Sequence, residues 1–314
     1  MRKCSRRGFA GCLLAMLFRP LNFKGQSTAA ASPTLPPGPG ARAAGASSRS
    51  ASRTYRADAV ILFLGISIYR RAGVGGGRAS FEETGEGASL RRALFFAGGS
   101  DPKQAHGLRR LGWIQEVVLG PASAPSEAAY FGVLTSSPEE SLEHARKSVA
   151  APPSGLSVFS AVSGRNTAGH SRSAVTHFDY ADSAIWSDRG LIEHAQSTFD
   201  AKVDWRETSW PNSPNQAPPT FLFQLATLLK QRARHAEGRY VYNEQEYLLE
   251  LEAPQTGHER ERLLLVHGKT HNLRTGHEVL FRLWLEDAAD SIVPVRIEFQ
   301  PRSFLRLTFE ALPA

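Results

Sequence analysis

The sequence predicts a mainly β protein of the α+β class, with antiparallel strands and a few helices. Three segments near the C-terminal end, 279–287, 292–300 and 304–310, carry apolar residues at odd positions and frequent charges at even positions. This period-two alternation is typical of an antiparallel sheet with one buried and one solvated face. Residues 287–290 and 301–303 are predicted to form the turns between these strands.

The first 31 residues have the layout of a secretory signal peptide. A basic segment precedes an apolar run of residues 8–18, and Ala29–Ala31 offer a small-residue cleavage site. The apolar run is too short to span a bilayer. Ser5–Phe9 resembles the twin-arginine export motif, and both that route and the general route remain open. The expected location is therefore periplasmic or secreted, and we predict no transmembrane segment after the leader.

The basic character of the chain also belongs to this leader. The formal net charge is +7, but residues 1–31 carry six basic and no acidic side chains, which leaves 31 basic against 30 acidic residues in the rest. The nearly balanced charge of the rest of the chain argues against nucleic-acid binding. Residues 32–53 are rich in Pro, Gly, Ala and Ser without apolar periodicity, so we predict a disordered linker. Residues 54–314 are predicted to form one domain.

The body opens with a β-rich run over residues 55–71 that is interrupted by Gly65, where we expect a bulge or tight bend. The glycine cluster at 73–77 lacks the Lys-Ser/Thr of a phosphate-binding loop, so we interpret it as a hairpin loop. Further strands are predicted within four later parts of the chain, which are residues 90–99, 113–134, 158–181 and 239–274.

Three helices are predicted among these strands. Residues 137–149 begin with a capping box, in which Ser137 precedes a proline and Glu140 follows three residues later. Residues 188–200 carry apolar side chains on one face, and residues 219–231 have a wide apolar face at helical spacing.

The segment 281–299, with Trp-Leu-Glu-Asp followed by Pro-Val-Arg-Ile-Glu, and the helix around 221–229 resemble bacterial secreted proteins of the domain of unknown function 3108. The segment 55–77 also resembles the N-terminal strand pair of that family, and the segment 130–149 resembles related uncharacterised exported acidobacterial proteins. This resemblance implies a half β-barrel, a curved antiparallel sheet with helices on its concave face, akin to lipoprotein-sorting carriers. It brings no catalytic residues.

Histidines and carboxylates in the body invite catalytic or metal-site hypotheses. His267, His271 and His277 are close in sequence, but residues four apart on a strand are ~13 Å apart, too far to share an ion. His177, Asp179 and Asp182 could form an acid/base group, although no motif supplies a nucleophile. We interpret both groups as solvated polar residues and predict no catalytic residues, metal or cofactor.

The two faces of the C-terminal strands suggest different roles. Arginines and glutamates alternate on the even face, which predicts a ladder of cross-strand ion pairs. A curved sheet whose helices do not cover its dry face would leave an apolar groove. We therefore predict a non-enzymatic binding or carrier protein for a lipid or acyl chain. The alternatives are a structural or interaction protein of the cell envelope and, more remotely, an envelope hydrolase. The candidate ligand-binding residues on this dry face are Phe281, Leu283, Val295, Ile297, Leu307 and Phe309.

Overall fold

The computed structural model describes residues 48–63, 66–101, 103–105, 111–121, 123–135, 156–181, 188–202, 205–210, 215–243, 245–256, 263–288, 291–302 and 305–313. The predicted leader and the predicted helix at 137–149 lie outside these residues.

All strands of the described chain belong to one antiparallel sheet, and the mainly β fold class is confirmed. The strands are β1 (Ser48–Phe63), β2 (Ile66–Thr84), β3 (Arg91–Ser100), β4 (Leu111–Leu119), β5 (Glu127–Thr135), β6 (Leu156–Thr167), β7 (His170–Ala181), β8 (Arg206–Ser209), β9 (His235–Tyr242), β10 (Gln245–Glu252), β11 (Gln255–Thr256), β12 (Leu263–Asn272), β13 (Glu278–Glu286), β14 (Arg296–Arg302) and β15 (Leu305–Ala311). The helices of the described residues are the 3₁₀ turn η2 (Gly87–Ser89), α2 (Arg189–Lys202) and α3 (Phe221–Gln231).

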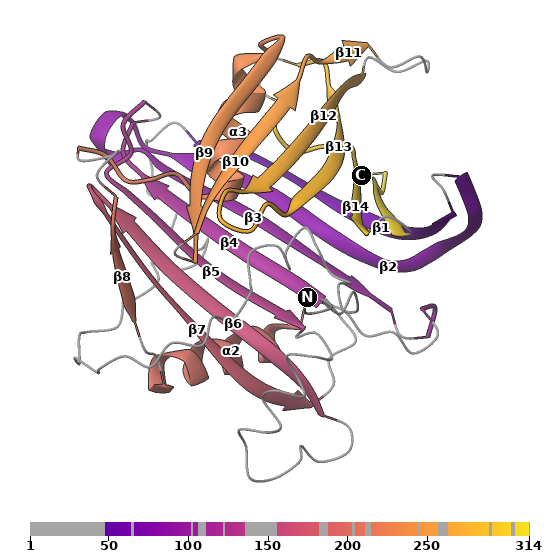
Figure 1. Ribbon diagram of the computed structural model, residues 1–314, viewed down its shortest axis with the longest axis horizontal. Helices are drawn as coiled ribbons and strands as arrows, with labels where there is room; N and C mark the ends of the chain where they lie inside the picture. Colours follow the sequence, from indigo (N-terminus) through magenta and orange to yellow (C-terminus); the bar gives the residue numbers. More distant parts are fainter. Residues whose placement is uncertain are drawn as a thin grey trace, which may run out of the picture.

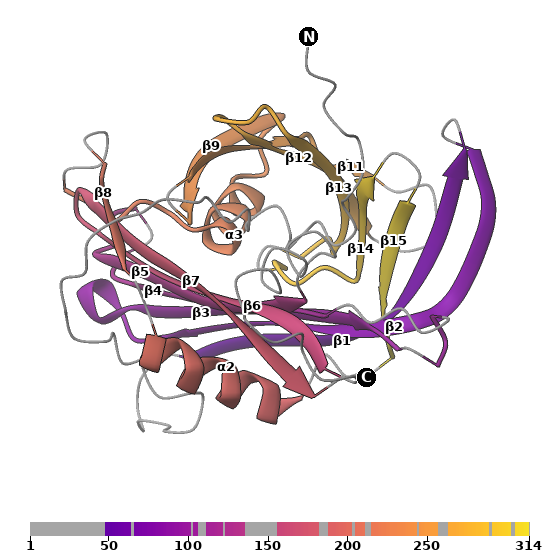
Figure 2. The same cartoon turned by 60° about the horizontal axis from the view of Figure 1, so that its bottom comes forward.

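The sheet consists of two meanders that we call leaves. The N-terminal leaf contains β1 to β8, and the C-terminal leaf contains β9 to β15. The last strand, β15, returns to pair with β1, from Tyr55 opposite Ala311 to Ile61 opposite Leu305. This pairing joins the leaves, and the C-terminal leaf curves over the N-terminal one (Figures 1 and 2). The result is an open, strongly curved sheet.

The two α-helices lie on opposite faces of the N-terminal leaf. Helix α3 occupies the concave space between the leaves, as predicted, whereas α2 packs beneath the N-terminal leaf (Figure 2). Alternation within β5 explains this division, because Tyr130 joins the core between the leaves while Phe131 and Val133 join the cluster with α2. The prediction that the helices share the concave face is therefore wrong for α2.

The N-terminal end of the sheet differs from the prediction. Strand β1 begins at Ser48, inside the predicted linker, and residues 48–53 pair with β2 from Ser48 opposite Thr84 to Arg53 opposite Ala79. The side chains of residues 48–52 are exposed, so their small polar character does not oppose a strand. Strand β1 ends at Phe63 and β2 begins at Ile66, so the bulge or bend predicted at Gly65 lies outside the described residues.

The glycine cluster 73–77 therefore lies within β2, and its interpretation as a hairpin loop is wrong. Close packing explains two of these glycines, Gly75 and Gly77, whereas Gly73 has a φ of 64° that favours glycine. A Cβ atom on Gly75 would collide with the backbone of Gly99 on β3, and a Cβ on Gly77 would lie 3.2 Å from the ring of Phe309. Glycine in a strand commonly marks such close approach.

The C-terminal meander confirms the predicted alternation. The odd residues of β13, from Val279 to Leu285, are buried, while its even residues are mostly exposed. Strand β14 begins only at Arg296, because residues 292–294 leave the ladder and Pro294 has no N–H to donate. It then continues through Arg302 across a register shift, so part of the predicted turn at 301–303 is strand.

Among the described residues, neither helix has the length and apolar character needed to cross a bilayer.

Candidate functional site

Helix α3 is anchored to the N-terminal leaf by a buried carboxylate. Thr220 occupies the N-cap position in an extended conformation, but its side chain makes no capping hydrogen bond to the helix. Glu116 of β4 takes that role. Its carboxylate accepts hydrogen bonds from the backbone N–H groups of Leu222 and Phe223, both at 3.1 Å, and from the Thr220 hydroxyl. Free N–H groups at a helix start favour such an acceptor.

Burial dominates the electrostatics of this contact. Glu116 is 0% exposed. Burial raises the pKa of its carboxyl to about 7, although the three donors at the start of α3 oppose the shift. A change of protonation at neutral pH would therefore act directly on the contact that holds α3 in place.

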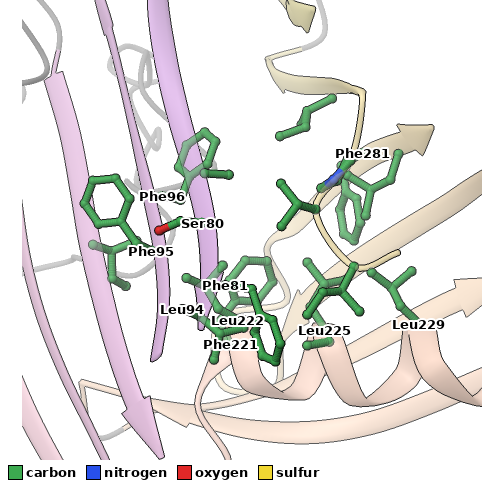
Figure 3. Close-up of a pocket in the computed structure, with 18 residues that line it drawn as sticks. Ser80, Phe81, Leu94, Phe95, Phe96, Phe221, Leu222, Leu225, Leu229 and Phe281 are labelled. Atoms are coloured by element: carbon green, nitrogen blue, oxygen red, sulfur yellow. The ribbon is translucent and has the colours of Figure 1, made fainter. Parts of the chain in front are cut away.

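An apolar cavity of about 80 Å³ lies beside α3, between the two leaves. Ser80 is the one lining residue with a polar side chain. The view in Figure 3 shows the walls, which come from β2 and β3 on one side and from α3 and the C-terminal leaf on the other. The lining residues are Ala79, Ser80, Phe81, Leu94, Phe95, Phe96, Ile114, Phe221, Leu222, Leu225, Ala226, Leu229, Phe281, Leu283, Ile292, Val293, Pro294 and Ile297.

The cavity is bordered by incompletely buried leucines. Leu222, Leu225 and Leu229 project from α3 at positions that share one face of a helix, and all three are only partly buried. Opposite them, residues 292–294 form the wall contributed by the segment between β13 and β14. Apolar side chains that retain solvent exposure next to a cavity mark the place where an apolar ligand would gain contacts.

The structure divides the six sequence-predicted binding residues into two groups. Phe281, Leu283 and Ile297 line the cavity. Phe309 does not, because its ring lies over Gly77 and Gly98 and stacks against Phe299.

The remaining two candidates, Leu307 and Val295, do not line the cavity either. Leu307 is partly buried against the core between the leaves. The backbone N–H of Val295 donates to the carbonyl of Trp284 at 2.8 Å. The apolar face of β15 is therefore covered by other residues of the sheet.

Sequence reasoning missed the wall that comes from the N-terminal leaf and the anchor of α3. Phe81, Leu94 and Phe96 reach the cavity only because β15 pairs with β1 and folds the C-terminal leaf over them. Glu116 carried a local signal, since it is an acidic residue inside the apolar strand segment 113–119. A buried acid in a strand indicates a partner that donates hydrogen bonds.

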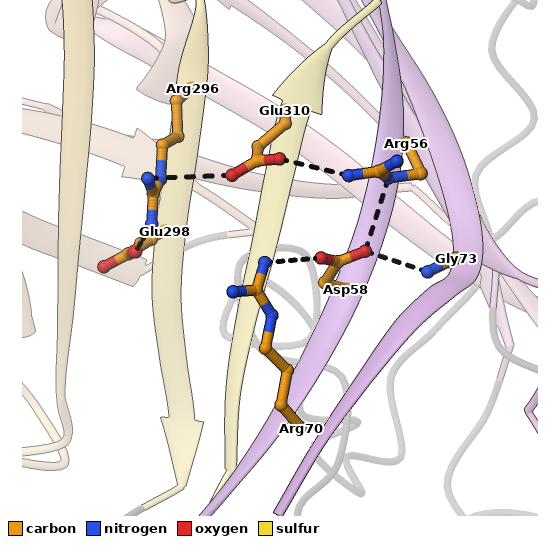
Figure 4. A network of polar contacts seen from close by, with 7 residues as sticks. All are labelled: Arg56, Asp58, Arg70, Gly73, Arg296, Glu298 and Glu310. Atoms are coloured by element: carbon orange, nitrogen blue, oxygen red, sulfur yellow. Dashed lines mark hydrogen bonds and ion pairs between the residues drawn. The ribbon is translucent and has the colours of Figure 1, made fainter. Parts of the chain in front are cut away.

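The solvated face carries the predicted ion-pair ladder (Figure 4). Arg296 contacts Glu298 and lies 3.6 Å from Glu310, which in turn lies 3.3 Å from Arg56. Arg282 lies 3.8 Å from Glu298. The ladder prediction is confirmed for Arg282, Arg296, Glu298 and Glu310, whereas Glu286 pairs with Arg53 of β1.

The ladder continues onto β1 and β2 through Asp58, which accepts hydrogen bonds from Arg70 at 2.9 Å and from the backbone N–H of Gly73 at 2.8 Å. Burial raises the pKa of Asp58, but these bonds and the charges of Arg56 and Arg70 outweigh burial and lower it.

The carboxylates and histidines weighed for catalysis lie on strands. Ser160 and His177 face each other across β6 and β7, with the serine Oγ 2.9 Å from His177 Nδ1. In a Ser-His-Asp triad the serine hydroxyl instead hydrogen-bonds to Nε2 of the histidine, and the aspartate accepts a hydrogen bond from Nδ1. Asp182 lies outside the described residues.

The histidines 267, 271 and 277 show no shared ion site within the described part of the chain. His271 Nδ1 lies 3.2 Å from the Glu278 carboxylate, and the backbone of His267 pairs with that of Arg282. These contacts are those of a polar sheet face.

No family model matches the chain. No curated protein matches it either. One similar solved structure is the crystal structure of a β-barrel-like protein of domain of unknown function DUF1849 from Brucella abortus, with 8% sequence identity, 83% of this chain and 94% of that chain covered, and a TM-score of 0.41. The resemblance to the domain of unknown function 3108 stays a prediction.

Proposed function

We propose that the protein is a non-enzymatic binding protein that takes up an apolar, lipid-like chain in the cavity beside α3. The observation that carries this proposal is the chemistry of the cavity wall, in which a single serine interrupts seventeen residues without polar side chains. Such a wall offers no group that could orient or activate a polar substrate, so we propose no chemical step. In this proposal the leader exports the protein, and it acts in the periplasm or outside the cell.

The size of the cavity limits what it can take without rearrangement. At about 80 Å³ it is well below the roughly 300–1,000 Å³ of typical small-molecule pockets. It can therefore hold only the end of an alkyl chain. A longer chain would lie along Leu222, Leu225 and Leu229, whose exposed surface it would cover, or would displace the segment 292–294.

The small volume of the cavity also favours a second candidate function. Helix α3 lies in the concave space between the leaves and leaves a cavity of only about 80 Å³ (Figure 2), as expected for a structural or interaction protein of the envelope that needs no ligand. An experiment must separate the two functions.

Native mass spectrometry of the full chain with hexadecanoic acid tests the proposal. We expect one fatty acid per wild-type chain. Ala226 lines the cavity, so Ala226→Leu should fill it and weaken binding about tenfold, since each apolar carbon that no longer fits costs roughly 0.8 kcal/mol. The matched control is Ala51→Leu on β1, because Ala51 is exposed and does not line the cavity.

Two results would count against the binding function. A wild-type chain that takes up no fatty acid would favour the structural role. Equal binding by wild type and Ala226→Leu would place the ligand elsewhere on the molecule.

A further inference from the structure

A hairpin arm projects from the junction of the leaves. It has three strands at its base, where β15 pairs with residues 59–61, and two strands beyond Ile61. It consists of residues 59–63 of β1 and 66–74 of β2. Strand β3 ends at Ser100, which pairs with Gly75, so among the described residues the part of β2 before Val74 has no strand partner on that side. Strand β15 covers β1 only as far as Ile61, opposite Leu305. The arm is visible as the long curved hairpin that extends beyond the rest of the sheet (Figures 1 and 2).

The tip of this arm is apolar and exposed. Ile66, Ile68 and Tyr69 are 70%, 62% and 53% exposed, and they account for half of the six large exposed hydrophobic residues in the described chain. Ile68 is the extra residue at a register shift between the pairs Ile61–Tyr69 and Leu62–Ser67. Exposed apolar side chains that cluster in this way mark an interaction site.

The base of the arm is basic. Arg70 and Arg71 directly follow the apolar tip, and Arg70 remains 60% exposed while it binds Asp58. Arg306 lies across from Val60 on the same face.

Three carboxylates act on Arg70, and all are already paired (Figure 4). Asp58 is 2% exposed and also accepts the backbone N–H of Gly73. The side chains of Glu298 and Glu310 are 7% and 33% exposed and contact arginines of the ladder.

The shape of the arm favours a membrane over a protein partner. A stable protein interface buries about 800 Å² on each side. Three side chains at the two-stranded end of the arm present a far smaller surface. A bilayer needs no matching surface, since apolar residues enter the acyl region, tyrosine lies at the headgroup level and arginines attract anionic lipids.

We propose that the arm docks the protein on an anionic lipid bilayer, with Ile66 and Ile68 inserted and Arg70 and Arg71 at the headgroups. The proposal rests on the exposure and charge of the arm and does not require a ligand in the cavity. It goes beyond the proposed binding function, because it assigns a separate surface with a partner of its own.

Local tryptophan quenching by brominated lipids tests the docking without interference from the leader. Ser67 lies between the two isoleucines and is exposed, so Ser67→Trp places the probe at the tip. The matched probe is Leu280→Trp on β13, because Leu280 is 56% exposed and lies away from the arm. With full-length protein and brominated vesicles of phosphatidylglycerol and phosphatidylcholine, we expect added quenching for Ser67→Trp and none for Leu280→Trp.

A second set of variants tests the chemistry of the contact. Replacing Ile66, Ile68 and Tyr69 by serine should weaken vesicle binding about tenfold or more, since the inserted apolar surface is lost. Leu280→Ser should bind like wild type. Unchanged melting temperatures verify that the variants fold.

Three outcomes would overturn the proposal. The first is no added quenching for Ser67→Trp on anionic vesicles. The second is equal quenching on phosphatidylcholine alone, which would remove the role of the arginines. The third is a tip variant that binds vesicles normally but loses self-association, which would assign the arm to a second copy of the chain.

Discussion

Helices α2 and α3 pack against the same sheet in different ways. Helix α2 lies on the outer face of the N-terminal leaf, where Leu191, Ala195 and Phe199 are at most 3% exposed and pack against β5, β6 and β7. Helix α3 lies between the leaves, yet Leu222, Leu225 and Leu229 remain partly exposed beside a cavity. The more enclosed helix therefore has the less complete packing.

The number of surfaces explains this difference. A helix on one leaf can settle until most of its apolar face is covered, as α2 does for Leu191, Ala195 and Phe199, while Ile192 stays partly exposed. A helix between two leaves must match both surfaces, and Glu116 fixes the start of α3 to one of them. A cavity then remains where the C-terminal leaf does not pack closely against α3. Such a cavity is uncommon, because protein interiors are close-packed.

The largest expected effect is the difference in unfolding free energy between core truncations in the two helices. Phe199→Ala in α2 should cost about 3–5 kcal/mol of unfolding free energy, because a fully packed ring is lost. Leu225→Ala in α3 should cost only about 1 kcal/mol, because its side chain already borders a cavity and keeps solvent exposure. Urea denaturation measures both values. Equal costs would mean that α3 is packed as tightly as α2.

The next effect concerns the anchor of α3 and its dependence on pH. The folded-state pKa of Glu116 is raised from 4.5 to about 7, so the folded state binds the proton more tightly than the unfolded state. The stability from this group is fully present below pH 4.5 and is lost as pH rises through 7. The wild type should lose about 3 kcal/mol relative to Glu116→Gln over this range. Parallel pH profiles of the two proteins would contradict the assignment.

The smallest effect comes from adding volume to each helix. Ala195→Leu in α2 should destabilise the protein by about 1–3 kcal/mol, because Ala195 is 0% exposed in a filled cluster. Ala226→Leu in α3 should change stability by less than about 1 kcal/mol, because the new atoms enter the cavity. Thermal unfolding compares the two substitutions directly. A larger loss for Ala226→Leu would show that the cavity cannot accept added groups.

Local pattern predicted much of the fold. The alternation in β13 and the apolar face of α3 are properties of consecutive residues, and both are confirmed. The pairing of β1 with β15 joins residues more than 240 positions apart in sequence, and no local pattern encodes it. The glycines at 73–77 suggested a loop because the neighbours that require them, Gly99 and Phe309, come from distant strands.

Only the cavity wall that the C-terminal leaf contributes was predictable from the sequence. Phe281, Leu283 and Ile297 follow from the alternation of the C-terminal strands, whereas Phe309 follows the same alternation but packs onto glycines of the N-terminal leaf. Alternation identifies which face is dry and does not say which part of that face is left uncovered. That depends on how the two leaves and α3 fit together.

Photo-crosslinking with a diazirine-labelled hexadecanoic acid, mapped by peptide mass spectrometry, tests the central claim most directly. The expected crosslinks lie on residues 222–229 of α3 and on 292–294, which face each other across the cavity. Their yield should fall in Ala226→Leu and persist in Ala51→Leu. Crosslinks confined to α2 or to the arm, or a yield unaffected by Ala226→Leu, would contradict a binding site beside α3.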